Sequence, residues 1–119
     1  MSPKELIRHW VSLFNEGNAN EIAALYHENA TNHQMPNKAI HGRKAIFHMF
    51  KTEFDQYDMT CIIENLYEDG EWVILEWKGR SVKMRACGFF HIKEGKIVLQ
   101  RGYWDKLTFM KEQASLTPE

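Results

Sequence analysis

The chain has 119 residues, of which 44% are hydrophobic and 26% charged, and this composition excludes a disordered chain and leaves room for one domain, predicted over residues 1–119. Fifteen basic against sixteen acidic residues give a net charge of -1 without a basic stripe, which excludes nucleic acid as an expected partner. No apolar run approaches the roughly 20 residues of a membrane helix, and the two distant cysteines form no disulfide framework, so we expect no membrane association and a cytoplasmic location.

The N-terminus carries the signals of a capped amphipathic helix. The hydroxyl of Ser2 can accept a hydrogen bond from an early backbone N–H, Pro3 suits the first helical position, and Gly17 supplies a terminating residue. Between them, apolar side chains recur at three- and four-residue spacing and form one stripe, which contains Leu6, Trp10, Leu13 and Phe14. The pattern predicts a helix whose stripe faces the core.

Two further helices are predicted before the sheet begins. Asn18, with an acidic residue three positions later, starts a short second helix that is predicted to fade by residues 28–29. The polar stretch 30–39 is predicted as a short strand followed by a loop. Gly42 then precedes a third helix over residues 43–54, whose apolar stripe contains Ile46, Phe47, Phe50 and Phe54.

From residue 59 the pattern changes to runs of β-branched, aromatic and aliphatic residues. They predict four strands, over residues 59–67, 71–79, 84–93 and 96–105. The tight turn sequences Asp69-Gly70 and Glu94-Gly95 favour an antiparallel meander. A last helix is predicted from about Thr108 to Ser115, followed by a frayed tail over residues 116–119. Helices followed by an antiparallel sheet predict an α+β domain in which the helices cover one face of the sheet.

The other face of the predicted sheet is also partly apolar. In the second strand Val73, Leu75 and Trp77 share the face expected to meet the helices. Apolar residues remain on the opposite face, namely Ile74, Val98, Trp104 and Ile62. A sheet with two partly apolar faces either pairs with another subunit or encloses a ligand cavity, and we expect a homodimer.

Several short motifs occur in the order of a known family. They are Asn32-His33, the helix start Gly42-Arg43-Lys44-Ala45-Ile46, the turn Gly95-Lys96-Ile97, and Trp104-Asp105. With these motifs the chain resembles the SnoaL-like polyketide cyclase family of the nuclear transport factor 2-like superfamily. The resemblance implies a cone-shaped fold with a strongly curved, mostly antiparallel sheet around the N-terminal helices, one apolar pocket, and a dimer.

The resemblance also implies chemistry. The family's cyclases need no metal or organic cofactor and use an aspartate of the last long strand as acid/base in an intramolecular aldol closure. Asp105 matches that position. Two features depart from the family pattern: the connection 79–83 is short, which predicts a reduced pocket rim, and residues 108–110 replace the usual Gly-Leu-Leu of the terminal helix. The superfamily also contains isomerases, dehydratases, epoxide hydrolases and members that only bind, so the fold does not choose an activity.

Asp105 has two interpretations. A carboxylate that faces a dry pocket has its pKa raised by desolvation and can exchange protons near neutral pH. Alternatively, Asp105 caps a helix that starts at Lys106, a task for which Thr108 competes. We expect the pocket orientation, with a pKa above the ordinary value of about 3.9.

His33 and Tyr103 complete the predicted catalytic set. His33 lies on a segment that the resemblance places in the pocket wall, and an imidazole can relay a proton near neutral pH. Tyr103 shares the strand face of the catalytic aspartate and can donate a hydrogen bond to a substrate oxygen. Arg101, one step deeper, is either a substrate-binding residue or the ion-pair partner of Glu64 or Glu76.

Aromatic residues supply the predicted apolar lining, although each also suits a plain core position. They are Trp10, Phe14, Phe47, Phe50, Trp77 and Phe90. The six histidines include no pair at one-turn helical spacing and no carboxylate in a ligand motif, so no metal site is predicted.

Two functional hypotheses follow. The first is a cofactor-independent enzyme of the SnoaL-like type that acts on a small apolar carbonyl-bearing or cyclic molecule by acid/base chemistry, as a cyclase or an isomerase-like enzyme. The second is a non-catalytic member of the superfamily that binds a small molecule or has a structural role. The two differ in whether a carboxylate must point into the cavity within reach of a ligand.

Overall fold

The computed structural model describes residues 1–116 of the chain. Its elements are α1 (Pro3–Glu16), α2 (Ala19–Ala23), β1 (Tyr26–Gln34), β2 (Ile40–His41), α3 (Arg43–Gln56), β3 (Cys61–Asp69), β4 (Trp72–Gly79), β5 (Arg85–Lys93), β6 (Lys96–Tyr103) and α4 (Lys106–Leu116). The predicted frayed tail covers residues 116–119, but Leu116 is the last residue of α4, and residues 117–119 lie outside the described residues. Among the described helices, none has the length and apolar character that crossing a membrane requires.

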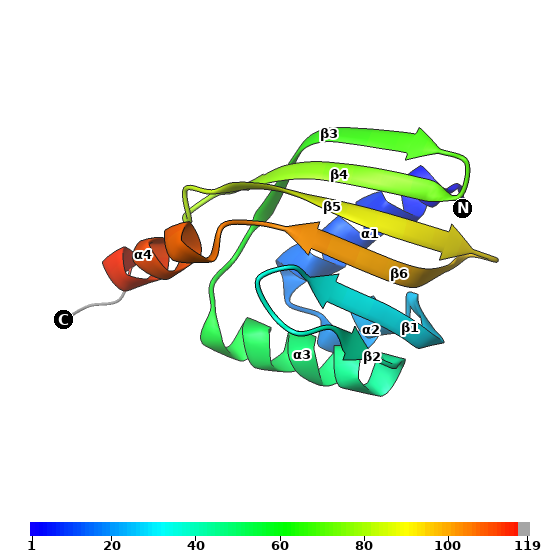
Figure 1. The fold of residues 1–119 in the computed structure, drawn as a ribbon, viewed down its shortest axis with the longest axis horizontal. Coiled ribbons are helices and arrows are strands. Elements are labelled where there is room, and N and C mark those ends of the chain that lie inside the picture. The colour runs from blue at the N-terminus through cyan, green and yellow to red at the C-terminus, as the bar shows by residue number, and fades with distance from the viewer. Residues whose placement is uncertain (117–119) are drawn as a thin grey trace.

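The strands form one curved six-stranded sheet in the order β2-β1-β6-β5-β4-β3. Helices α1, α2 and α3 lie along one face of this sheet, while α4 projects beyond the end of β6 (Figure 1). Neighbouring strands are antiparallel except for β1 and β6, which run parallel. The predicted α+β architecture, with a mostly antiparallel curved sheet around N-terminal helices, is confirmed.

Local signals set the start and end of the first helix as predicted. The Ser2 hydroxyl accepts a hydrogen bond from the backbone N–H of Glu5 at 3.1 Å, and Pro3 is the first helical residue. Gly17 ends α1 in the left-handed conformation, with φ of 67°, a geometry that glycine adopts without steric cost. Asn18 caps α2 through a bond from the backbone N–H of Glu21.

The second helix is shorter than predicted. It ends at Ala23, and the chain enters strand β1 at Tyr26, so the prediction that helix continues to residues 28–29 is wrong. Tyr26 pairs with Ile97 of β6 and its side chain is fully buried. Pairing with a strand that lies about 70 residues later outweighs the local helical pattern, because tertiary burial exceeds intrinsic propensity.

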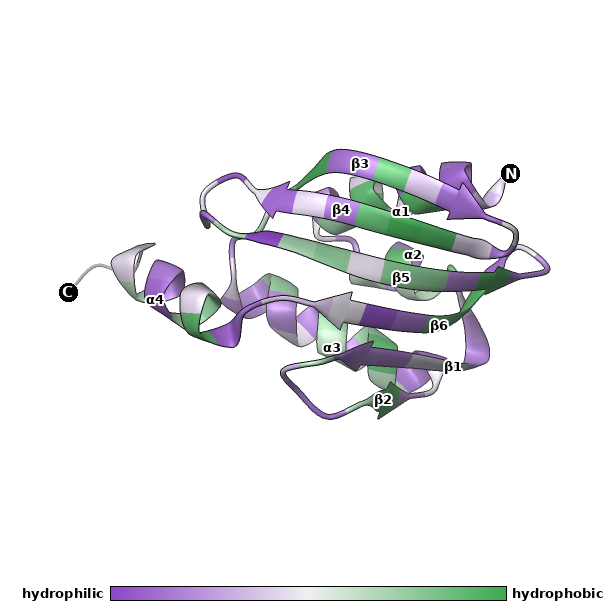
Figure 2. Cartoon of the chain, turned by 45° about the horizontal axis from the view of Figure 1, so that its top comes forward, coloured by the Kyte–Doolittle hydropathy of each residue, from purple (hydrophilic) through white to green (hydrophobic). Residues whose placement is uncertain are grey.

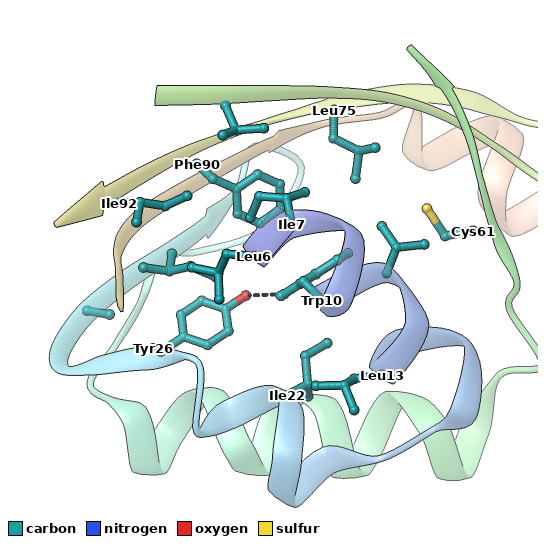
Figure 3. Close-up of a cluster of buried hydrophobic side chains, with 14 of the residues drawn as sticks. Leu6, Ile7, Trp10, Leu13, Ile22, Tyr26, Cys61, Leu75, Phe90 and Ile92 are labelled. Carbon is teal, nitrogen blue, oxygen red and sulfur yellow. Dashed lines mark hydrogen bonds between the residues drawn. The ribbon is translucent and has the colours of Figure 1, made fainter. Parts of the chain in front are cut away.

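The core lies between α1 and the inner face of the sheet. Ile7 and Trp10 of α1 point toward Leu75 and Phe90 of the sheet, as Figure 3 shows. The predicted inner face of β4 is confirmed for Val73 and Leu75, which are completely or almost completely buried. Figure 2 shows a long hydrophobic run in β4, whereas β1 and the second half of β6 are hydrophilic. These two hydrophilic segments pair with each other, with Asn32 opposite Gln100 and His33 opposite Arg101.

An extra residue in β6 decides which of its side chains face the helices. Ile97 and Leu99 lie opposite consecutive residues of β5, which makes Val98 the extra residue of a β-bulge. Ile97 and Gln100 are therefore both buried on the inner face although three positions separate them. Arg101, one residue later, points to the outer face. Every residue after the bulge thus lies on the face opposite to that given by simple alternation from Ile97.

Candidate functional site

A cavity of about 840 Å³ lies at the end of the sheet where β6 meets α4. Its walls come from α1, α3, α4 and residues of all six strands. Five of the predicted lining residues meet there: Trp10, Phe14, Phe50, Trp77 and Phe90. The volume suits a small organic molecule, since ligand cavities usually measure about 300–1,000 Å³.

Packed aromatic rings hold the apolar wall in place. The indole of Trp10 stacks on Phe14 with ring centroids 5.4 Å apart and meets the edge of Phe90 at 5.2 Å. At the side formed by α4, Phe109 packs against Tyr57 at 5.1 Å and Trp104 at 5.4 Å. Such contacts fix ring positions, which keeps the cavity preformed.

Two buried amide side chains give the cavity a polar end. Asn32 is 1% exposed and Gln100 is 5% exposed, and they are neighbours in the register of β1 and β6. The Gln34 amide bonds to Asn32, at 2.7 Å, and accepts from the indole N–H of Trp104, at 2.9 Å. A Cβ atom at Gly102 would overlap the Gln34 amide, so glycine at this position leaves room for the network.

Glu53 is the one acidic side chain that lines the cavity within residues 1–116. It lies one helical turn after Phe50 on α3 and is half-buried, and its carboxyl makes no hydrogen bond or ion pair in that part of the chain. Burial raises the pKa of the Glu53 carboxyl to about 7. Its charge in turn raises the pKa of Tyr26, which is already raised by burial. The group can therefore give or take a proton near neutral pH.

The Cys61 thiol also lies in the cavity wall. Burial raises its pKa to about 12, so the thiol stays protonated at neutral pH. Cys61 is therefore not a thiolate nucleophile at neutral pH.

Three predicted site residues lie on the outer face of the sheet instead. His33 and Arg101 are register neighbours there, and Tyr103 is 38% exposed. The Arg101 guanidinium lies 5.2 Å from the ring centroid of Trp72 and 5.9 Å from that of Phe89, so it pairs with neither proposed carboxylate. The expectation that these side chains share the pocket is wrong. The bulge at Val98 turns Arg101 and Tyr103 to the outer face, and His33 follows the inward-facing Asn32 on β1 and therefore points outward.

Asp105 caps α4. Its carboxylate accepts a hydrogen bond from the Thr108 hydroxyl at 2.5 Å, and its backbone oxygen accepts from the N–H of Phe109. The side chain is exposed, and the Thr108 hydrogen bond holds the pKa of Asp105 below its usual value. The predicted rise of this pKa is wrong, since the carboxylate never leaves water. The last helix accordingly begins at Lys106, two residues before the predicted start at Thr108.

Phe47 also lies outside the cavity. It borders a separate surface depression together with Glu16 and Lys51. Elsewhere in the described part of the chain, no three histidine, cysteine or acidic side chains lie close enough together to hold a metal ion.

The sequence analysis missed the polar residues that do line the cavity. Glu53 lies three residues after the buried Phe50, a spacing that places two side chains on one helix face, and this was the available signal. Gln100 lies inside an apolar strand and Gln34 within a polar one, and no local pattern distinguishes these two amides from surface residues.

Solved structures with this fold include characterised enzymes. An epoxide hydrolase/cyclase-like enzyme, SalBIII, described in pyran ring formation in the polyether salinomycin, has a TM-score of 0.80 with 25% identity, over 89% of this chain and 92% of that chain. An LEH-like epoxide hydrolase from M. tuberculosis has a TM-score of 0.80 with 15% identity, over 95% of this chain and 90% of that chain.

A third similar structure is an NTF2-like protein of unknown function from Cytophaga hutchinsonii ATCC 33406. Its TM-score is 0.78 with 16% identity, over 92% of this chain and 96% of that chain. A comparison with curated proteins found no match.

The SnoaL-like domain model matches residues 7–100. These findings support an enzyme-like or ligand-binding role at the level of the family. Because the match spans most of the sequence and agrees with the curved sheet and its helices, the chain belongs to the SnoaL-like domain family.

Proposed function

We propose that the protein is a cofactor-independent enzyme that binds a small apolar, carbonyl-bearing or cyclic molecule in the cavity and moves a proton with Glu53. The observation that carries this proposal is the half-buried Glu53 carboxyl, which faces an apolar cavity without a hydrogen-bond or ion-pair partner in residues 1–116. Burial of an unpaired acid costs stability, so such a group is characteristic of functional sites.

The proposed step is a reversible proton transfer at the carbon next to a carbonyl group. The Glu53 carboxylate takes the proton, the C–H electron pair forms a C=C bond, and the carbonyl electron pair moves to the oxygen. Return of the proton from Glu53 to a carbon of the substrate restores the base and completes an isomerisation or prepares a ring closure. The similarity to an epoxide hydrolase/cyclase-like enzyme supports acid/base chemistry in a cavity of this fold.

Proton exchange in D₂O tests this function without knowledge of the natural substrate. With 2-tetralone as the probe, the protein is expected to accelerate deuterium uptake next to the carbonyl, followed by mass spectrometry. The rate is expected to rise with pH around a midpoint of about 7, because the base must be ionised. Glu53→Gln is expected to lower the accelerated rate by at least about 100-fold.

Asp105→Asn is the matched comparison for this experiment, since it also neutralises one carboxylate. The proposal expects this variant to keep its rate, because Asp105 is an exposed helix cap. Loss of exchange in Asp105→Asn with retention in Glu53→Gln would contradict the proposal and restore the assignment of the catalytic acid/base to Asp105.

Binding without turnover is the second candidate function. It is favoured by the neutral character of the other buried polar groups, since Asn32 and Gln100 supply no second acid/base group. In that case 2-tetralone would bind to the protein and show no accelerated exchange at any pH.

Cys61 and Cys87 are free thiols, which supports the prediction of a cytoplasmic location.

A homodimer through the outer face of the sheet is also part of the proposal. Ile74 and Phe89 are register neighbours there, and Phe89 packs against Tyr103 with ring centroids 5.8 Å apart. Trp104, which was expected on this face, lies in the cavity wall instead. The aromatic and aliphatic side chains still leave an apolar surface that a second copy would cover.

Light scattering at micromolar concentration is expected to give twice the chain mass of 14.1 kDa. Phe89→Asp places a charge at the centre of the outer face and is expected to give the monomer mass, whereas Tyr67→Phe, at the exposed edge, is expected to remain dimeric. A monomer mass for the unmodified protein would contradict the proposed dimer.

A further inference from the structure

Two tryptophan side chains determine the direction of the hydrogen bonds at the polar end of the cavity. An indole N–H donates a hydrogen bond and cannot accept one, so the atom that it contacts must be an acceptor. The orientation of each amide that follows in the network is then fixed in turn, because an amide has one oxygen that accepts and one nitrogen that donates.

The first chain of bonds begins at Trp104. Its Nε1 donates to Oε1 of Gln34 at 2.9 Å, which places the Gln34 nitrogen on the other side. That nitrogen donates to Oδ1 of Asn32 at 2.7 Å. The Asn32 nitrogen is then left with only the Sδ atom of Met49, at 3.9 Å, which is a weak acceptor.

The second chain of bonds begins at Trp10. Its Nε1 donates to the Tyr26 hydroxyl at 3.0 Å, the bond drawn in Figure 3. The Tyr26 hydroxyl in turn donates its hydrogen to Oε1 of Gln100. The Gln100 nitrogen therefore keeps its N–H groups, and within residues 1–116 it donates to no acceptor.

The network thus occupies all three amide oxygens and leaves amide N–H groups available. We infer that the polar end of the cavity is built to receive a hydrogen-bond acceptor, the oxygen of a ketone or aldehyde, held by Nδ2 of Asn32 and Nε2 of Gln100. Both side chains line the cavity from paired positions of β1 and β6. Each of the three amide oxygens already accepts a hydrogen bond, whereas the Gln100 N–H groups have no acceptor within residues 1–116, so a ligand acceptor is favoured over a ligand donor. This inference rests on the proposed function and specifies the substrate class of the same site.

The same donors suit the proposed proton transfer. When Glu53 removes a proton next to the carbonyl, negative charge develops on the carbonyl oxygen. Preoriented N–H groups in a largely apolar cavity stabilise such a charge, because they need no reorganisation during the reaction. Asn32 and Gln100 would therefore bind the reacting oxygen, whereas Trp104 and Trp10 act as positioning residues through Gln34 and Tyr26.

A pair of isosteric probes tests the inference. The ketone 2-acetylnaphthalene and the alkene 2-isopropenylnaphthalene differ in C=O against C=CH₂, and equilibrium dialysis gives a dissociation constant for each. Gln100→Met is expected to reduce the preference for the ketone, the ratio of the two constants, by about tenfold or more. Asn32→Leu, the second variant, is expected to act in the same direction. Met84→Leu changes an apolar wall residue without an amide and is expected to leave the ratio within about twofold.

The carbonyl stretch of the bound ketone gives a second measurement, which a purely structural effect would not change. With a ¹³C=O label, the stretch is expected at lower wavenumber in the unmodified protein than in Gln100→Met, because hydrogen bonds weaken the C=O bond. In the binding experiment, Trp104→Phe is expected to give a ratio of the two dissociation constants between that of the unmodified protein and that of Gln100→Met. The reason is that the Gln34 amide can rotate once the indole N–H no longer fixes it.

If both probes bind and the ratio is unchanged in Gln100→Met and Asn32→Leu, the inference is overturned while binding in the cavity stands. If neither probe binds to the unmodified protein, the proposed function fails as well.

Discussion

Replacement of Glu53 by glutamine is expected to stabilise the protein at pH 8 by up to about 3 kcal/mol, the free-energy equivalent of the rise in its pKa from 4.5 to about 7. The folded state holds the proton of this carboxyl more tightly than the unfolded state. The contribution of Glu53 to the free energy of unfolding is therefore most favourable below pH 4.5. It falls as the pH rises from 4.5 through about 7, and it is constant at higher pH. Glutamine carries no charge at any of these pH values and removes the loss.

Urea denaturation at pH 4, 6 and 8 measures this difference. The gain of the Glu53→Gln variant over the unmodified protein is expected to be close to zero at pH 4 and largest at pH 8. Asp55→Asn, an exposed position two residues later on the same helix, is the control and is expected to be neutral throughout. A Glu53→Gln variant that is less stable at pH 8 would show that the carboxylate has a stabilising partner, and the proposed acid/base role would lose its physical basis.

Removal of the Tyr26 hydroxyl is expected to destabilise the protein by about 2–4 kcal/mol, although phenylalanine fits the same space. The hydroxyl accepts from the indole N–H of Trp10 and donates to the amide oxygen of Gln100, and Tyr26 is 0% exposed. In Tyr26→Phe both partners remain buried without a hydrogen bond, and each unsatisfied group costs about 1–3 kcal/mol.

Tyr67→Phe makes the same chemical change at a residue that is 54% exposed, and it is expected to leave the free energy of unfolding within about 0.5 kcal/mol. Urea denaturation of both variants at pH 7 provides the comparison. Equal stabilities for Tyr26→Phe and Tyr67→Phe would mean that the buried bonds are replaced, for example by rotation of the Gln100 amide. That rotation would turn Oε1 of Gln100 toward the cavity. The Tyr26→Phe variant would then show a reduced preference for the ketone over the alkene in the binding experiment.

The stability expectations and the proposed chemistry have one physical origin. The largely apolar lining of the cavity makes an unpaired Glu53 costly and makes oriented N–H groups effective, because electrostatic interactions are stronger where the dielectric constant is low. The fold holds both features on rigid elements, with Glu53 on α3 and the amides on paired strands. The protein therefore gives up stability at the site where the proposed reaction takes place.

Local sequence determined the elements whose signals are complete within a few residues. Ser2, Pro3 and Gly17 define α1 through backbone groups of the helix itself, so the sequence was sufficient for its bounds. The turn at Asp69-Gly70 and the alternation of Val73 and Leu75 likewise fixed the β3–β4 hairpin and its inner face, since both depend on adjacent residues. The family resemblance, which rests on such local motifs in order, was confirmed for the same reason.

Tertiary structure alone decided the strand at Tyr26, the polar end of the cavity and the surroundings of Glu53. Tyr26 is extended because β6 pairs with it, and Glu53 is half-buried because it faces the cavity that residues of the sheet, α3 and α4 line together. The bulge at Val98 is set by the register between β5 and β6, which sequence alternation cannot count. One extra residue turned Arg101 and Tyr103 outward and Gln100 inward, because consecutive side chains of a strand point to opposite faces and a shift by one residue exchanges the two faces.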